Sequence, residues 1–217
     1  MSTTKKRRAD GVETRTTILD AATKLATVEG LDGLSIGRLA DHIGMSKSGL
    51  YAHFGSKEEL QLAAIDTATE IFTETVIRPA REAETAFGRL EALCENFLRY
   101  LEQSVFPGGC FFASATAELD THPGRVREKL VEAMDGWLGL IERRVREAQE
   151  AGELDPAEDP ALVAFELDAF MKMGNSLWLL HGGRGGLDQA RAAIRARLAR
   201  AQVQRPRSTG PRSIASS

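Results

Sequence analysis

The segment from Ile36 to Lys57 constrains the fold more than any other part of the chain. Apolar residues recur at Ile36, Leu39 and Ile43, which is the spacing of one face of a short helix. Gly44 follows, and glycine readily adopts the left-handed conformation in which helices commonly end. The pattern predicts a short amphipathic helix that stops at a tight turn.

A second short helix is predicted directly after that turn. Ser46 is a favourable N-cap, and Leu50 and Phe54 lie four residues apart on one face. Together with the small residue Ala40, the spacing Ala40-x3-Gly44-x5-Leu50 is typical of a helix-turn-helix, which places its second helix in the DNA major groove. His53 departs from the usual pattern because an apolar residue is common at that position.

Two lysines stand where a helix dipole disfavours cations. Lys47 follows the cap Ser46, and Lys57 follows Ser56, which with Glu59 forms a capping box. A bound phosphate at the same place would make these positions favourable for a cation. We interpret the two lysines as candidate phosphate contacts, although a surface lysine by itself carries no such meaning.

Residues 46–60, SKSGLYAHFGSKEEL, resemble the recognition segment of TetR-family (TetR/AcrR-type) transcriptional regulators, and the resemblance extends over about residues 14–62. It implies a homodimeric regulator with an N-terminal DNA-binding domain and a larger ligand-binding and dimerisation domain. By position, it implies groove contacts from Ser46, Lys47, Ser48 and Gly49, and phosphate contacts from Tyr51, His53, Lys57, Ser35 and Arg38. For Tyr51 a second interpretation stays open, in which the ring packs half-buried against the first helix.

The hydrophobic pattern predicts an all-α fold of about nine helices: a three-helix helix-turn-helix domain followed by a larger helical domain. We expect a disordered basic arm over residues 1–11, with the first helix beginning near residue 13. The DNA-binding domain then spans residues 12–60, and the ligand-binding and dimerisation domain spans residues 61–204. A disordered tail is expected over residues 205–217.

Charge divides the chain in the same way. Residues 1–57 carry nine Lys/Arg and six Asp/Glu, a net charge of +3, whereas residues 58–217 carry a net charge of −6. A basic head on an acidic body fits a DNA-binding protein with a separate sensor domain. The sequence shows no signal peptide and no apolar run of membrane-spanning length, and two cysteines suit a reducing cytoplasm.

Two long helices near the C-terminus, at about residues 160–180 and 187–203, are predicted to form a dimer interface. The first is apolar around much of its girth, and both suit a four-helix seam made with the same helices of a second copy. A helix-turn-helix gains useful specificity from two half-sites, which favours a homodimer over burial of these helices in a monomer core.

The larger domain is expected to enclose a mostly apolar cavity for a small effector. Aromatic and sulfur-containing side chains point to an apolar or aromatic molecule, although each of them could equally be ordinary core. The candidate lining residues are Phe97, Phe106, Cys110, Phe111, Met134, Trp137, Phe170 and Trp178.

Three other functions compete with a ligand-responsive repressor. Cys110 follows a Pro-Gly-Gly break near a helix start, where a thiol pKa can fall, so a thiol-based redox or electrophile sensor is one alternative. An all-helical enzyme and a purely protein-binding dimer are the others. We find no nucleophile–base motif, no cofactor-binding motif and no metal spacing, since the histidines are isolated.

Overall fold

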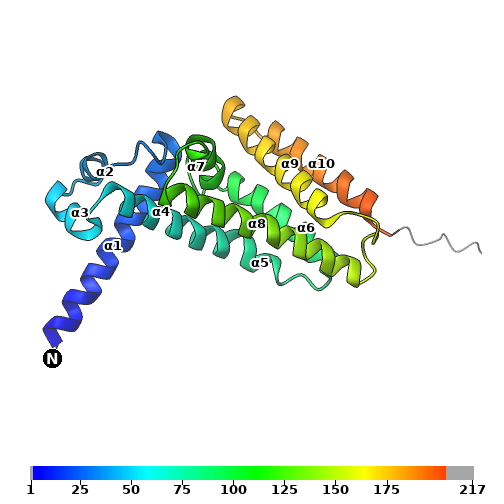
Figure 1. The fold of residues 1–217 in the computed structure, drawn as a ribbon, viewed down its shortest axis with the longest axis horizontal. Coiled ribbons are helices and arrows are strands. Elements are labelled where there is room, and N and C mark those ends of the chain that lie inside the picture. The colour runs from blue at the N-terminus through cyan, green and yellow to red at the C-terminus, as the bar shows by residue number, and fades with distance from the viewer. Residues whose placement is uncertain (1, 204–217) are drawn as a thin grey trace, which may run out of the picture.

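The computed structural model describes residues 2–203, with side chains from residue 13 onward, and this part of the chain is helical throughout its regular structure (Figure 1). The elements are α1 (Ser2–Glu29), α2 (Ile36–Ile43), α3 (Lys47–Phe54), α4 (Lys57–Phe72), the π-helix η1 (Thr73–Ile77), α5 (Arg78–Ala80), α6 (Ala86–Glu102), α7 (Phe111–Leu119), α8 (Arg125–Glu150), α9 (Pro160–His181) and α10 (Gly185–Ala201). The predicted all-α fold is confirmed.

The helix boundaries around the turn follow the local sequence signals. The Ser35 hydroxyl accepts the Arg38 backbone N–H at 3.3 Å, and the Ser46 hydroxyl accepts that of Gly49 at 3.1 Å. Gly44 ends α2 with φ = +70°, the left-handed conformation that glycine adopts without steric cost. These contacts fix α2 and α3 as the two helices of the predicted helix-turn-helix.

The N-terminal arm is a correction to the sequence analysis. Residues 2–11 are helical and extend α1, which was expected to begin near residue 13. Lysine, arginine and alanine are good helix formers, and adding residues to an existing helix avoids the unfavourable nucleation step. The predicted tail at residues 205–217 lies outside the described residues.

One long helical rod connects the two ends of the molecule. The segments α4, η1 and α5 follow one another without a loop, so the helix continues through Pro79 to Ala80. Proline is tolerated because it stands at the start of α5. Within η1 the wider backbone is supported by Asn96, whose side-chain amide donates to the Val76 carbonyl at 3.1 Å. With these three counted as one rod, residues 2–203 form nine helical segments.

The helix-turn-helix end packs on the body through α1, α4 and the stretch from residue 106 to the end of α7 (Figure 1). The Gly108 backbone N–H donates to the Thr27 hydroxyl at 3.1 Å, and that of Asp32 donates to the Glu118 carboxylate at 3.1 Å. Gln61 on α4 also donates its side-chain amide to the Leu31 carbonyl at 2.7 Å. The two ends of the molecule are therefore joined by the rod and by a second connection.

Helices α9 and α10 lie side by side along one edge of the body (Figure 1). Helix α9 is capped by Asp159, whose carboxylate accepts the Ala161 backbone N–H at 2.9 Å. Helix α10 begins at Gly185, two residues earlier than the apolar pattern suggested. Arg197 holds the pair together because its buried guanidinium binds both Glu158, before α9, and Glu166 on α9.

Candidate DNA-binding and ligand-binding sites

Helix α3 presents a polar, exposed surface at the end of the molecule that lies away from α9 and α10 (Figure 1). Ser46, Lys47 and Ser48 are exposed at its N-terminus, and Gly49 is half-buried. On the opposite face, Leu50 and Phe54 are buried inside the head, which is the helix-turn-helix domain formed by α1, α2, α3 and the start of α4. An exposed polar surface with a buried apolar back is the form in which a recognition helix enters a groove.

The two predicted phosphate-binding lysines already have carboxylate partners. The Lys57 ammonium donates to the Asp32 carboxylate at 2.7 Å, and it lowers the pKa of Asp32 through this hydrogen bond and its charge. The Lys47 ammonium lies 3.8 Å from the Asp41 carboxylate. Neither carboxylate partner was predicted from the sequence, and the phosphate contacts of both lysines stay a prediction. Both pairs are exposed, so each contributes little to stability and is open to exchange for a phosphate.

The other side chains predicted to contact DNA differ in their exposure and in the partners that they already have. The Tyr51 side chain is 59% exposed, which excludes the half-buried packing that the sequence left open. Arg38 is exposed and pairs with Glu29, while Ser35 is half-buried and occupied as a cap. His53 is half-buried, and its backbone carbonyl accepts a hydrogen bond from Arg15.

Arg15 is a head residue that the sequence reasoning missed. Its guanidinium donates to the His53 carbonyl at 2.8 Å and lies 4.5 Å from the centre of the Phe54 ring. A cation over an aromatic face is attracted to it, so this contact fixes α1 against the C-terminal end of α3. Because Arg15 and His53 are 38 residues apart, no local sequence pattern indicates their contact.

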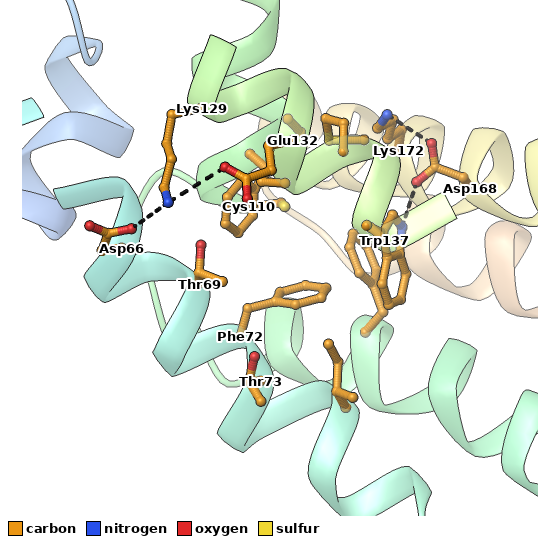
Figure 2. A pocket seen from close by; sticks show the side chains of 17 residues that line it. Asp66, Thr69, Phe72, Thr73, Cys110, Lys129, Glu132, Trp137, Asp168 and Lys172 are labelled. Carbon is orange, nitrogen blue, oxygen red and sulfur yellow. Dashed lines mark hydrogen bonds and ion pairs between the residues drawn. The ribbon is translucent and has the colours of Figure 1, made fainter. Parts of the chain in front are cut away.

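A cavity of about 270 Å³ lies in the body between the rod and helices α6 to α9. Figure 2 shows aromatic side chains in its middle and charged side chains at two ends. Its lining residues are Asp66, Thr69, Phe72, Thr73, Ile77, Phe97, Cys110, Phe112, Ala113, Lys129, Glu132, Ala133, Met134, Gly136, Trp137, Asp168 and Lys172.

Half of the predicted lining residues are found at the cavity. Phe97, Cys110, Met134 and Trp137 line it, whereas Phe106, Phe111, Phe170 and Trp178 do not. Phe106 and Phe111 are fully buried in a cluster of aromatic rings with Tyr100. Phe170 and Trp178 lie on α9 and pack against the core elsewhere. Aromatic content alone did not distinguish cavity-lining residues from core residues. The sequence had left open that each of these side chains is ordinary core.

The charged residues of the cavity were not predicted. At one end Asp168 accepts the Trp137 indole N–H at 3.0 Å and pairs with the Lys172 ammonium at 2.7 Å. At the other end, Lys129 lies 3.0 Å from the Asp66 carboxylate and 3.7 Å from that of Glu132 (Figure 2). The cavity is thus apolar and aromatic in its middle and ionic at both ends.

Cys110 lies at the cavity with its side chain buried at the N-cap of α7. Burial raises the pKa of its thiol, and this effect outweighs the opposing hydrogen bonds from the Ala113 and Phe112 backbone. Burial likewise raises the pKa of Cys94 to about 12. The structure therefore does not favour a thiol-based sensor, which needs an accessible thiolate.

This burial predicts slow alkylation of Cys110. In a Cys94→Ser background, iodoacetamide at pH 7.5 is expected to react with Cys110 of the folded protein more slowly than with a model thiol, because the side chain is buried and a raised pKa reduces the thiolate fraction. Mass spectrometry of timed samples measures the rate. Alkylation faster than that of the model thiol would restore the redox interpretation.

Within residues 2–203, no group of three or more His, Cys, Asp or Glu side chains is arranged to hold a metal ion. Over the same residues, no helix is long and apolar enough to cross a membrane.

A helix-turn-helix head joined by a helical rod to a body with an internal cavity defines a class of DNA-binding transcriptional regulators. Residues 18–64 match the family model described as "Bacterial regulatory proteins, tetR family". Residues 86–194 match the model described as "Tetracyclin repressor-like, C-terminal domain", which by itself covers half of the chain. The chain belongs to the TetR family of transcriptional regulators, as the resemblance of residues 14–62 implied.

Individual relatives agree with this assignment. A TetR transcriptional regulator from Chloroflexus aurantiacus has the same fold, with a TM-score of 0.83 and 27% identity over 89% of this chain and 98% of that one. The nucleoid occlusion factor SlmA of a Marinomonas strain is 27% identical over 143 residues, 66% of this chain and 71% of that protein. The transcriptional activator FasR of Mycolicibacterium smegmatis is 32% identical over 90 residues, 42% of this chain and 41% of that protein.

Proposed function

We propose that the protein is a homodimeric repressor that binds a pseudo-palindromic operator through two copies of α3 and leaves it when a small molecule occupies the cavity. The main support for this proposal is the position of α4, the first helix of the rod. Its first residue, Lys57, lies in the head, and Asp66, Thr69 and Phe72 of the same helix line the cavity. A ligand that contacts these side chains acts directly on the helix that positions the head.

For the DNA contacts we propose two groups of residues. Ser46, Lys47, Ser48 and Gly49 at the N-terminus of α3 face the major groove. Tyr51, His53, Lys57, Ser35 and Arg38 hold phosphates on either side. The exposure of Tyr51 and of both lysines supports this assignment, since a phosphate contact needs a side chain that DNA can reach.

For the dimer we propose a seam of α9 and α10 from both copies. Helix α9 exposes large apolar side chains, with Phe165 66% and Leu180 77% exposed. One face of α9 has exposed residues at spacings of three or four: Leu162, Phe165, Ala169, Met173, Ser176 and Leu180. Helix α10 exposes small residues at similar spacing: Ala192, Ala196 and Ala199. Large side chains beside small ones suit close helix packing in a four-helix seam.

Selection of bound duplexes from a random pool, using the full-length protein, tests the proposal. We expect a pseudo-palindromic site whose half-sites are about 10 base pairs apart or a multiple of that. Affinity for the site is expected to fall steeply as salt rises, because phosphate contacts release counterions. Sequence-independent or salt-independent binding contradicts the proposal. A reporter placed behind the selected site shows whether the protein represses, or activates as FasR is named to do.

Paired substitutions separate the two roles of Lys57. Lys57→Ala is expected to weaken binding to all sequences equally and to reduce the salt slope by about one. Asp32→Asn releases Lys57 from its carboxylate partner and is expected to strengthen binding. Fluorescence anisotropy at several salt concentrations measures both. If the two substitutions weaken binding alike, Lys57 serves the head structurally through its ion pair and does not contact phosphate.

Because the family is described as bacterial regulatory proteins, we infer that the protein acts on DNA in the cytoplasm. An enzymatic role has no support from a specific observation, since the family consists of transcriptional regulators.

A further inference from the structure

The cavity contains a buried carboxylate at the edge of its aromatic surface. The side chain of Asp168 is only 9% exposed, and it is held by the Trp137 indole on one oxygen and by the Lys172 ammonium on the other. From this arrangement we propose that the effector has an aromatic or aliphatic body and a cationic nitrogen, and that this nitrogen replaces the Lys172 ammonium on Asp168. The inference rests on the proposed function of the cavity as the effector site.

The charge of the lining favours a cation over an anion. Three carboxylates, from Asp66, Glu132 and Asp168, face two ammonium groups, from Lys129 and Lys172. Each ammonium group already has a carboxylate within 3.0 Å. At the buried end, an anionic ligand would have to remove Lys172 from Asp168 and leave a carboxylate that is only 9% exposed without a counter-charge, which is costly inside a protein.

A cationic ligand can bind beside Asp168 without leaving it uncompensated, because the Lys172 ammonium can move away as the ligand takes its place. Its side chain is 38% exposed, so its ammonium group can turn into water on its four-carbon stem when a ligand takes its place. Asp168 cannot follow in the same way because it is buried and fixed by Trp137. The exchange keeps one positive charge beside the carboxylate throughout.

The aromatic rings beside Asp168 suit the same kind of ligand. The ring of Trp137 packs edge-on against Phe72 at 5.0 Å and stacks near Phe97 at 6.2 Å between ring centres. Figure 2 shows Phe72 and Trp137 between the two charged ends of the cavity. Aromatic faces attract cations and also bury an apolar body, so one surface can accept both parts of the molecule.

Three probes with the same phenylbutyl framework test this charge preference on the full-length protein: 4-phenylbutylammonium, 4-phenylbutanol and 4-phenylbutyrate. By isothermal titration calorimetry, the ammonium compound is expected to bind about tenfold more tightly than either of the others, as a charge-assisted hydrogen bond exceeds a neutral one. Equal or tighter binding of the alcohol or the butyrate, or no binding of the ammonium compound, overturns the inference.

Two substitutions test whether Asp168 is the carboxylate responsible for the preference for a cationic ligand. Asp168→Asn keeps an oxygen for the Trp137 indole but removes the charge, so the ammonium compound is expected to lose its advantage over the alcohol. Lys172→Met leaves Asp168 without its cation, so the ammonium compound is expected to bind more tightly than to the wild type. Glu128→Gln is the control, because Glu128 is exposed on α8 and does not line the cavity.

These outcomes are separate from a failure of the proposed function. If Asp168→Asn does not fold, the response of Lys172→Met decides, and weaker or unchanged binding of the ammonium compound there contradicts the inference. If the ammonium compound binds as expected but does not reduce operator affinity in the anisotropy assay, the charge preference stands and ligand-driven release is the part that fails.

Discussion

Replacing Phe165 by glutamate is expected to convert the protein from a dimer to a monomer. Phe165 is 66% exposed in the N-terminal half of the apolar face of α9, where the proposed seam would bury it. A two-fold seam contains both copies of the substitution, so each dimer would bury two carboxylates without partners. At about 3 kcal/mol or more for each of the two unpaired buried charges, association weakens by about ten-thousandfold or more.

Analytical ultracentrifugation measures this change as a shift to the 23.6 kDa species. Val28→Glu is the matched control, because Val28 is 64% exposed but lies on α1, away from the proposed seam. Phe165→Leu keeps an apolar side chain and is expected to remain dimeric. A dimeric Phe165→Glu variant, or a monomeric wild type, contradicts the assignment of the seam to α9 and α10.

The sequence indicated that α9 takes part in dimerisation but not through which face. Its composition is apolar on several sides, because Val163, Leu167 and Met171 pack inward while Phe165 and Met173 point outward. Both sets are hydrophobic, so periodicity does not distinguish them. Only the positions of α8 and α10 against α9 show which set is already covered.

The helix-turn-helix was predictable because its signals are local. The caps Ser35 and Ser46 and the turn glycine Gly44 act within four residues of their own positions. By contrast, the ion pair of Lys57 with Asp32 was not predicted, because the two residues lie 25 positions apart in the sequence. A partner at that separation is visible only once the fold is known.

The cavity was the least predictable part for a related reason. Asp168 follows Leu167 in an apolar stretch of α9, and nothing in that stretch shows that its carboxylate meets the indole of Trp137, 31 residues earlier. The same limit applies to Asp66 and Lys129, which come from the rod and from α8 and pair only at the rim of the cavity. Helical periodicity predicts which residues turn inward but not which other helix they meet.

The second connection between the cavity and the head runs from residue 106 through α7. Cys110 at the start of α7 lines the cavity, while Gly108, two residues earlier, contacts Thr27 on α1. Glu118 near the end of α7 accepts the Asp32 backbone N–H before α2. These contacts form a second path between the cavity and the head that does not pass through α4.

Gly108→Ala is expected to disrupt this connection. A Cβ atom at Gly108 would lie 1.9 Å from the Thr27 carbonyl oxygen, far inside the contact distance of about 3.5 Å, so the loop and α1 must separate. We expect a loss of about 1–3 kcal/mol in the free energy of unfolding, the usual cost of overpacking. The displaced α1 is also expected to lower operator affinity by about tenfold, equivalent to about 1.4 kcal/mol.

Urea denaturation and operator anisotropy measure the two effects. Gly139→Ala on α8 is the matched control, because a Cβ there meets only the end of the Arg143 side chain at 3.5 Å. It is expected to be neutral or to stabilise the helix by about 0.5–1 kcal/mol. If Gly108→Ala lowers stability but leaves operator affinity equal to that of the control, the loop contributes only to folding, and α4 alone connects the cavity to the head.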